Sequence, residues 1–158
     1  MTVKRLIRSM LIVAGVLSAG CAVSQTETDT GAPLARQIAQ SAHCGLTAPG
    51  YLRVGSPEQL ARLEALPART LSLQALRNID YQREQVVLAS IGEKPTGGFG
   101  VTLENSKIVD GTLELTIRVK EPAPGTMVTQ SLTTPCAVIA VTAGGWNDIK
   151  ITRAENNR

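Results

Sequence analysis

Cysteine and histidine are the most reactive side chains of this 158-residue sequence, and it has few of them. The single histidine, His43, directly precedes Cys44, and two further cysteines are Cys21 and Cys136. An imidazole base beside a thiol is the pair that a cysteine nucleophile needs, with Cys44 or Cys136 as the attacking group. Adjacent residues rarely face each other productively, however, and the sequence offers no third group to orient the histidine. We therefore predict no catalytic residues and no enzymatic activity.

Other reactive sites find equally little support. Cys44, Cys136, the histidine and the scattered acids lack the spacing of a metal site, so we expect neither a metal nor a cofactor. No paired carboxylates fall on a plausible shared face. Gly97-Gly98 lacks the Gly-x-x-x-x-Gly-Lys pattern of a phosphate-binding loop, and a strand rather than a helix is expected after it.

The amino terminus has the layout of an export signal. Lys4, Arg5 and Arg8 precede an apolar run over residues 10–16, and small residues then lead into Cys21. The run is too short to span a bilayer core of about 30 Å comfortably as a permanent helix. Residues 1–20 are therefore predicted to be a signal peptide.

The residues that lead into Cys21 resemble a bacterial lipobox, although Ser18 stands where leucine is commonest. The resemblance implies cleavage before Cys21 and attachment of acyl chains such as palmitate to that cysteine. Several acyl chains, at about 0.8 kcal/mol per buried CH₂, anchor a protein stably in a membrane. Ala22 in place of aspartate resembles the sorting default for the outer membrane of Gram-negative cells. We expect a lipoprotein of the bacterial cell envelope that faces the periplasm; an ordinary cleaved signal with a chance cysteine is the alternative.

Removal of residues 1–20 changes the charge of the chain. The full sequence has 16 Lys and Arg, 13 Asp and Glu, and a formal net charge of +3. Three of the basic residues and none of the acids precede Cys21, so 13 charges of each sign remain. A nearly neutral protein lacks the clustered positive charge that nucleic-acid binding requires. We therefore expect no nucleic-acid partner.

Export also bears on Cys44 and Cys136. With Cys21 assigned to lipid, these two cysteines remain in an oxidising compartment, where an even count favours a disulfide. The chain-entropy model values closure of such a loop of roughly 90 residues at on the order of 4 kcal/mol. Two free buried thiols are the alternative. We predict the bridge, which would tie the amino-terminal segment to a carboxy-terminal strand.

Local patterns predict a tether and then a small helical part. Residues 21–33 have almost no large apolar side chain, which is typical of a flexible tether. Ser56 and Gln59 have the spacing of a capping box, and Pro57 suits the first helical position. The helix that starts here would place Leu60, Leu63 and Leu66 on one face and stop at Pro67. Shorter helices are expected over residues 34–42 and 71–77, and a short strand over residues 51–54.

The rest of the chain has the periodicity of strands. Residues 85–91 and 136–141 are continuous apolar runs, which suit strands buried on both faces. Asp110-Gly111 is a hairpin signal, and residues 113–119 then alternate between apolar and polar. Further strands are expected over residues 99–103, 127–132 and 149–152. These patterns predict an α+β fold, a mainly antiparallel β-sheet with one or two short helices in a single small domain.

The stretch from Ile91 to Val101 joins two of these strands and contains four glycines and a proline. In one interpretation it is a hairpin connection, in which Gly97 and Gly98 supply positive φ and Pro95 sets the turn. In the other interpretation the loop presents Thr96 and Phe99 beside exposed backbone for insertion into the groove of a partner. The residues alone favour the hairpin.

Several segments of this half of the chain resemble one family. They are Asp80-Tyr81, Val86-Val87, Gly92-Glu93-Lys94-Pro95-Thr96-Gly97-Gly98-Phe99, the strand over 113–119, Pro124-Gly125, and Leu132-Thr133-Thr134-Pro135 before the strand over 138–141. They are similar to the carboxy-terminal domain of the PrcB type, named after a lipoprotein subunit that stabilises and helps mature a secreted, subtilisin-like surface protease complex. The similarity is strongest over residues 80–141, within an expected domain of residues 34–158. Phe99 stands where the family usually has tyrosine.

The resemblance implies a non-catalytic, lipid-anchored module that binds or stabilises a partner protein at the cell envelope, such as a secreted or surface protease. It makes one loop the expected partner-binding site, composed of Lys94, Pro95, Thr96, Gly97, Gly98 and Phe99. The same loop is more weakly similar to the Asn-Pro-Thr-Thr-Gly-aromatic loop of chagasin-like inhibitors of cysteine proteases, without the leading Asn and the second Thr. Inhibition of a protease through this loop is the alternative function.

Overall fold

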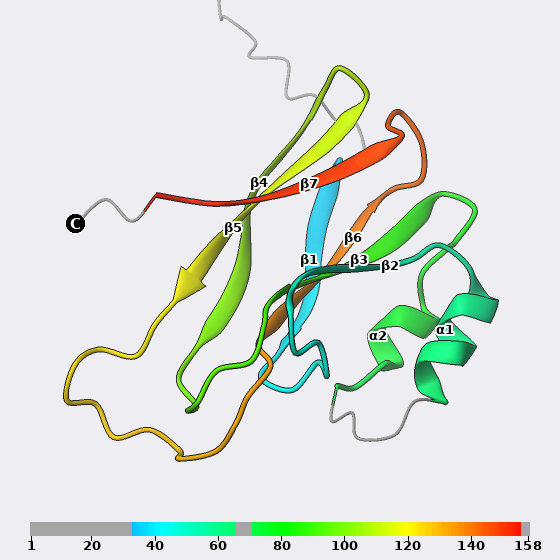
Figure 1. Cartoon of the computed structure of the whole chain (residues 1–158). Helices are drawn as coiled ribbons and strands as arrows, with labels where there is room; N and C mark the ends of the chain where they lie inside the picture. The colour runs from blue at the N-terminus through cyan, green and yellow to red at the C-terminus, as the bar shows by residue number, and fades with distance from the viewer. Residues whose placement is uncertain (1–32, 66–70, 156–158) are drawn as a thin grey trace, which may run out of the picture. The chain divides into compact units, whose positions relative to one another are not determined.

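A computed structural model of the chain describes residues 33–65 and 71–155. These residues form two β-sheets and two short helices (Figure 1). The predicted signal peptide, Cys21, nearly all of the tether, Leu66 and Pro67 lie outside the described residues, so what was expected of them stays a prediction. Within the described ranges, no helix combines the length and the apolar character needed to cross a membrane.

The first sheet has four antiparallel strands in the order β1-β6-β3-β2. Their bounds are Ala35–Ser41 for β1, Pro49–Val54 for β2, Glu84–Ile91 for β3 and Cys136–Thr142 for β6. The two central strands, β3 and β6, are buried along nearly their whole length, as their continuous apolar sequences predict. Because successive side chains point to opposite faces, these two strands contribute to two separate cores.

The helices α1 (Pro57–Glu64) and α2 (Gln74–Arg77) cover one face of this sheet (Figure 1). Leu60, Leu63 and Leu76 are buried there, in one cluster with Val86 and Leu88 of β3. The leucine spacing predicts this buried face correctly for the two leucines of α1 that the structure describes.

The start of α1 follows the predicted capping pattern with one difference. The Ser56 hydroxyl accepts a hydrogen bond from the Gln59 amide at 3.3 Å, and Pro57 occupies the first helical position. The Gln59 side chain does not return to the amide of Ser56, as it would in a capping box. Its Oε1 atom accepts instead from the amide of Gly55, at 2.7 Å. The Gln59 side chain therefore binds the backbone of Gly55, one residue before the N-cap Ser56.

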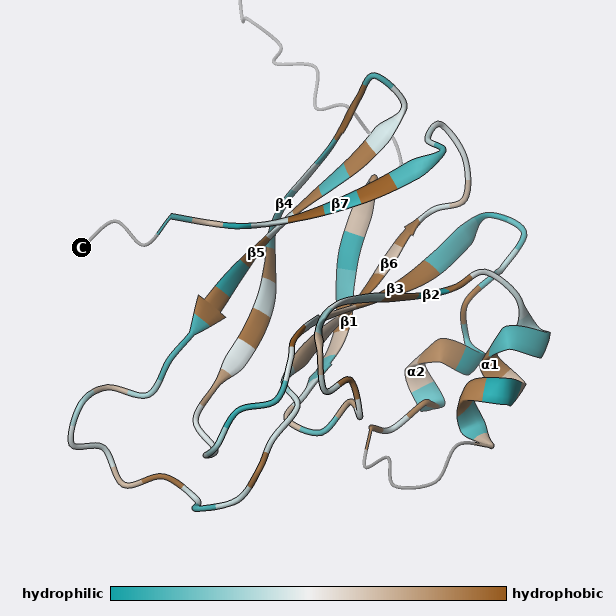
Figure 2. Ribbon diagram, viewed as in Figure 1, coloured by the Kyte–Doolittle hydropathy of each residue, from teal (hydrophilic) through white to brown (hydrophobic). Residues whose placement is uncertain are grey.

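The second sheet covers the other face of the first sheet. Its strands are β4 (Gly100–Val109), β5 (Thr112–Lys120) and β7 (Asp148–Arg153), in the order β4-β5-β7. β4 and β5 form the predicted hairpin, with positive φ at both Asp110 and Gly111, whereas β5 and β7 pair in parallel. Figure 2 shows the alternation of apolar and polar residues along β5. Its buried residues are Leu113, Leu115 and Ile117, in the core shared with the first sheet.

The helix predicted over residues 34–42 is wrong, because residues 35–41 form strand β1. β1 pairs with β6, and a register shift lies between Gln37 and Ala39. The Gln37 side chain accepts a hydrogen bond from the Leu103 amide of β4, at 2.7 Å. Pairing at the sheet edge and this contact with the second sheet outweigh the weak helical preference of the segment.

The strand predicted over residues 127–132 is also wrong. Residues 121–135 form a long connection between β5 and β6 (Figure 1). Met127 is 97% exposed and Leu132 is 63% exposed. Thr129 and Thr133 of this connection form backbone hydrogen bonds with another loop, as described next, and Thr134 and Pro135 bond to segment 42–44 and to the end of β3.

Candidate functional site: two interlocked loops

Loop 92–99, which contains the predicted partner-binding residues, is not a hairpin connection. β3 belongs to the first sheet and β4 to the second, so the loop carries the chain from one sheet to the other. It lies beside the long loop 121–135 (Figure 1). We call the exposed part of these two loops the two-loop surface.

Four hydrogen bonds hold the two loops together. The Lys94 amide donates to the Thr133 carbonyl at 2.8 Å, and the Thr133 amide donates to the Lys94 carbonyl at 2.9 Å. The Thr133 hydroxyl donates to the Thr96 carbonyl at 2.9 Å, and the Gly97 amide donates to the Thr129 carbonyl at 2.9 Å. Because Thr133 is 4% exposed, water competes little for the three bonds that this residue makes. The backbone of loop 92–99 is therefore fixed by its neighbour.

Two glycines of loop 92–99 are required by close packing as well as by conformation. Gly98 has a φ of +86°, and a Cβ atom there would lie 3.0 Å from Val128 Cγ1 and 3.1 Å from Pro122 Cβ. Gly92 has a φ of +76°, and its Cβ atom would lie 2.8 Å from Pro49 Cδ. Gly97 has no positive φ, so of the predicted pair only Gly98 supplies one.

The side chains of loop 92–99 differ in their exposure. Pro95 is exposed, and Lys94 and Thr96 are half-buried. The Phe99 ring packs against the core between the two sheets, and Lys94 Nζ lies 5.9 Å from its centroid. The partly buried ring of Phe99 therefore has a packing role in this loop.

The most exposed apolar side chains near this loop belong to loop 121–135. Met127 and Leu132 project from it, and Met127 also borders a hollow of about 470 Å³ together with Gly98, Lys120 and Thr129. Neither residue was predicted to be exposed, because both fall in the segment that was expected to form a strand. The available signal was their setting among Thr, Ser and Gln between Gly125 and Pro135, which is typical of a loop.

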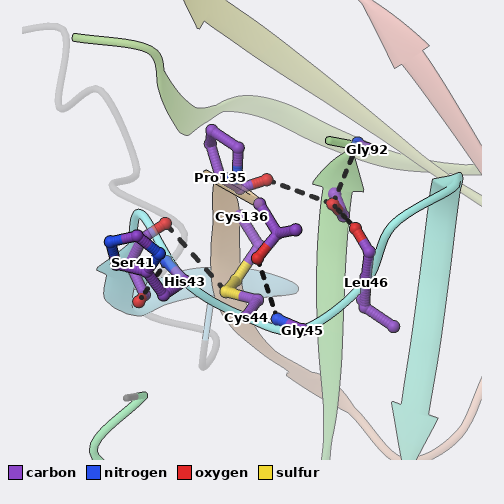
Figure 3. The surroundings of a disulfide bond; sticks show 10 residues. Ser41, His43, Cys44, Gly45, Leu46, Gly92, Pro135 and Cys136 are labelled. Carbon is purple, nitrogen blue, oxygen red and sulfur yellow. Dashed lines mark hydrogen bonds between the residues drawn. A yellow bond between two sulfur atoms is a disulfide. The ribbon is translucent and has the colours of Figure 1, made fainter. Parts of the chain in front are cut away.

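A disulfide lies at the end of loop 121–135, where β6 begins (Figure 3). Cys44 and Cys136 are bonded, with a Cα–Cα distance of 6.1 Å, and both are fully buried. The Cys44 amide donates to the Thr134 carbonyl at 3.0 Å. The disulfide and this hydrogen bond therefore tie segment 43–46 to the end of loop 121–135. The disulfide also removes both thiols from nucleophilic chemistry, and His43 lies exposed beside them.

Ser90 of β3 connects the start of loop 92–99 to the end of loop 121–135. Its hydroxyl donates to the Pro135 carbonyl at 3.1 Å and accepts from the Gly92 amide at 3.1 Å. Ser90 is 4% exposed, so both bonds are shielded from water. Gly92, the first residue of loop 92–99, and Pro135, the last residue of loop 121–135, thus both form hydrogen bonds with the Ser90 hydroxyl.

The titratable groups with displaced pKa values belong to the scaffold. The pKa of Glu114 is lowered, chiefly because Lys107 donates a hydrogen bond to it. Burial, with a smaller effect of the Glu64 charge, raises the pKa of Tyr81, and a hydrogen bond from Ser56 lowers that of Glu58. Among residues 33–65 and 71–155, no cluster of three or more His, Cys, Asp or Glu side chains forms a metal site.

The comparison with known families falls on the same part of the chain. Residues 85–142 match the family model described as PrcB C-terminal. This segment is PrcB-like. The match confirms the predicted resemblance, and it runs from β3 through both loops to the end of β6. The PrcB-type family is that of a protease complex subunit. No curated protein and no solved structure gave a significant match to the chain.

Proposed function

We propose that the chain is a non-catalytic, lipid-anchored subunit that binds and stabilises a partner protein at the bacterial cell envelope, and that the partner is a secreted or surface protease. The observation that carries this proposal is the two-loop surface. It exposes Met127 and Leu132 on a backbone that hydrogen bonds and a disulfide hold in place. It also lies within the segment that matches the protease-complex family.

The physical chemistry of this surface suits protein recognition. Methionine is flexible and polarisable, so an exposed methionine adapts to different apolar contacts. Leu132 and Pro95 extend the apolar character into both loops. Because the loops are already ordered, binding requires less loss of conformational entropy than a mobile loop would require.

The proposed anchor is the lipid on Cys21. A flexible tether of about a dozen residues has a root-mean-square end-to-end distance of roughly 20 Å. Residues 21–33 would therefore hold the folded part near the outer membrane, on its periplasmic side. Palmitate labelling tests the anchor: Cys21→Ser should lose the label and leave the membrane fraction, while the neighbouring Ala22→Ser should keep both. A label that persists in Cys21→Ser would refute lipidation at this residue.

Partner binding is tested by placing a photo-crosslinking amino acid at Met127 in intact cells. The control position is Val109, which is 40% exposed at the β4–β5 hairpin. We expect a protease adduct from position 127 and none from position 109. Met127→Asp combined with Leu132→Asp should remove the partner from pull-downs and shorten its lifetime, while Val109→Asp should do neither. The same adducts from both positions would exclude the two-loop surface as the binding site.

A further inference from the structure

β2 differs from the other edge strands of the structure. β1 and β4 carry register shifts, and β7 carries the charges of Asp148, Lys150 and Arg153. Bulges and charges are features that protect sheet edges from pairing with another chain. β2 pairs with β3 without any shift, and its protective features are confined to Pro49 at its first position and the single charge of Arg53. Its outer edge is therefore suited to receive another strand.

An apolar hollow of about 280 Å³ lies beside this edge, between β2 and α1. Aliphatic side chains of Leu52, Val54 and Leu63 form much of its wall, with Gln59, Arg53 and Arg62 completing it. Figure 1 shows α1 close to β2. A strand edge beside a pocket is the arrangement by which proteins bind extended peptides, since the edge binds the backbone and the pocket selects a side chain.

Two arginines lie along this edge of the sheet. Arg53 and Arg62 are exposed, and neither takes part in the ion pairs found among the described residues. The Arg53 guanidinium lies 5.0 Å from the centroid of the Trp146 ring, which restricts its orientation. Arg62 follows Glu58 by one helical turn and helps to lower the pKa of that carboxyl. Arg53 is thus the less compensated charge, and it favours an acidic ligand.

We propose that the edge of β2 binds an extended, acidic segment of a partner protein as an additional strand of the first sheet. Leu52 and Val54 face the helices, whereas Arg53 points to the opposite face. Alternate residues of the bound strand follow the same rule. An aliphatic residue would therefore fill the hollow, and an adjacent Asp or Glu would pair with Arg53. These residues are distinct from the two-loop surface, so the two sites can be tested separately.

A random peptide library displayed on phage, panned against the full chain, tests this site. We expect enrichment of peptides in which an aliphatic residue stands next to Asp or Glu. A selected peptide should bind Arg53→Glu about tenfold more weakly, which corresponds to the roughly 1.4 kcal/mol of one favourable charge pair. The matched variant Arg153→Glu, in the second sheet, should bind it as the unmodified chain does.

Two measurements separate strand addition from loss of folding and from side-chain contact alone. A peptide with lysine in place of its acid should bind Arg53→Glu better than the original peptide does. N-methylation of alternate peptide amides should weaken binding about tenfold in one of the two registers, because only one register donates to β2. The proposal is overturned by a library without such enrichment, by equal affinity for Arg53→Glu, or by equal binding of both N-methylated peptides. Self-association of the full chain that Arg53→Glu abolishes would also overturn it, by making a second copy the occupant.

Discussion

Lys94 and Thr133 exchange two backbone hydrogen bonds, at 2.8 and 2.9 Å, and so join loop 92–99 to loop 121–135. The conformation of the loop predicted to bind a partner therefore depends on a second loop. Changes in either loop should alter the stability of both, because the bonds are mutual and shielded from water. Exposed residues such as Met127 are the better targets for tests of binding, since their substitution leaves this connection intact.

Thr133→Val tests the connection at a single atom. The valine keeps the shape of threonine but leaves the Thr96 carbonyl without the donor that now lies 2.9 Å away. Loss of one partner of a shielded hydrogen bond costs about 1–3 kcal/mol, so we expect a drop of this size in the free energy of unfolding by urea. Thr102→Val, at an exposed position of β4, is the matched control and should change it by less than about 0.5 kcal/mol. Equal effects of the two substitutions would contradict the assigned role of the hydroxyl.

Gly92→Ala should destabilise the protein more than Gly125→Ala. Both glycines have similar positive φ values, +76° and +78°, so both substitutions incur the left-handed backbone penalty of about 1–2 kcal/mol. At Gly125 the new Cβ atom would meet no atom within 4 Å, whereas at Gly92 it would lie 2.8 Å from Pro49 Cδ. The difference between the two free energies of unfolding thus measures the close contact with Pro49. A larger loss for Gly125→Ala would show that this contact relaxes at little cost.

Local sequence predicts well the elements whose burial, turn or helix start requires particular residue types at neighbouring positions. β3 and β6 are buried on both faces and have continuous apolar sequences. The hairpin at Asp110-Gly111 needs two positive φ values, which this dipeptide favours. The start of α1 is marked by Ser56 and Pro57. In each case the deciding interactions lie within a few residues of each other.

The features that sequence reasoning missed depend on distant partners. β1 has no strand pattern and is specified by pairing with β6. The parallel pairing of β7 with β5 follows from the crossing of the chain between sheets after β6. For the candidate site, the glycines identified loop 92–99 correctly as an unusual backbone. The exposure of Met127 and Leu132 was missed because the apolar residues of this segment were given more weight than the Thr, Ser and Gln around them, which are typical of a loop.

The disulfide should contribute strongly to stability. The double variant Cys44→Ala, Cys136→Ala should lower the free energy of unfolding by about 2–5 kcal/mol, the usual cost of losing a native bridge. Urea unfolding with and without reductant measures it: reductant should lower the midpoint of the unmodified protein and leave that of the double variant unchanged. An unmodified protein whose midpoint ignores complete reduction of the bond would count against a stabilising role.

Stability should fall in acid partly through Glu114 at the centre of the second sheet. Lys107 of β4 lies 3.0 Å from its carboxylate and Lys150 of β7 lies 3.4 Å from it, so the three strands share one cluster of charges. The pKa of Glu114 is lowered, first by the hydrogen bond from Lys107. Its stabilising contribution is therefore complete above the unfolded pKa of about 4.3 and is lost as pH falls through the lower folded pKa.

Glu114→Gln should accordingly flatten the dependence of unfolding free energy on pH below about pH 5. Added salt should reduce the difference from the unmodified protein, because the lysines are exposed and their charges are screened. Glu121→Gln is the matched control, since Glu121 is exposed and forms none of the ion pairs found among the described residues. It should preserve the acid slope. Identical slopes for Glu114→Gln and the unmodified protein would mean that the charges around Glu114 do not stabilise the folded state.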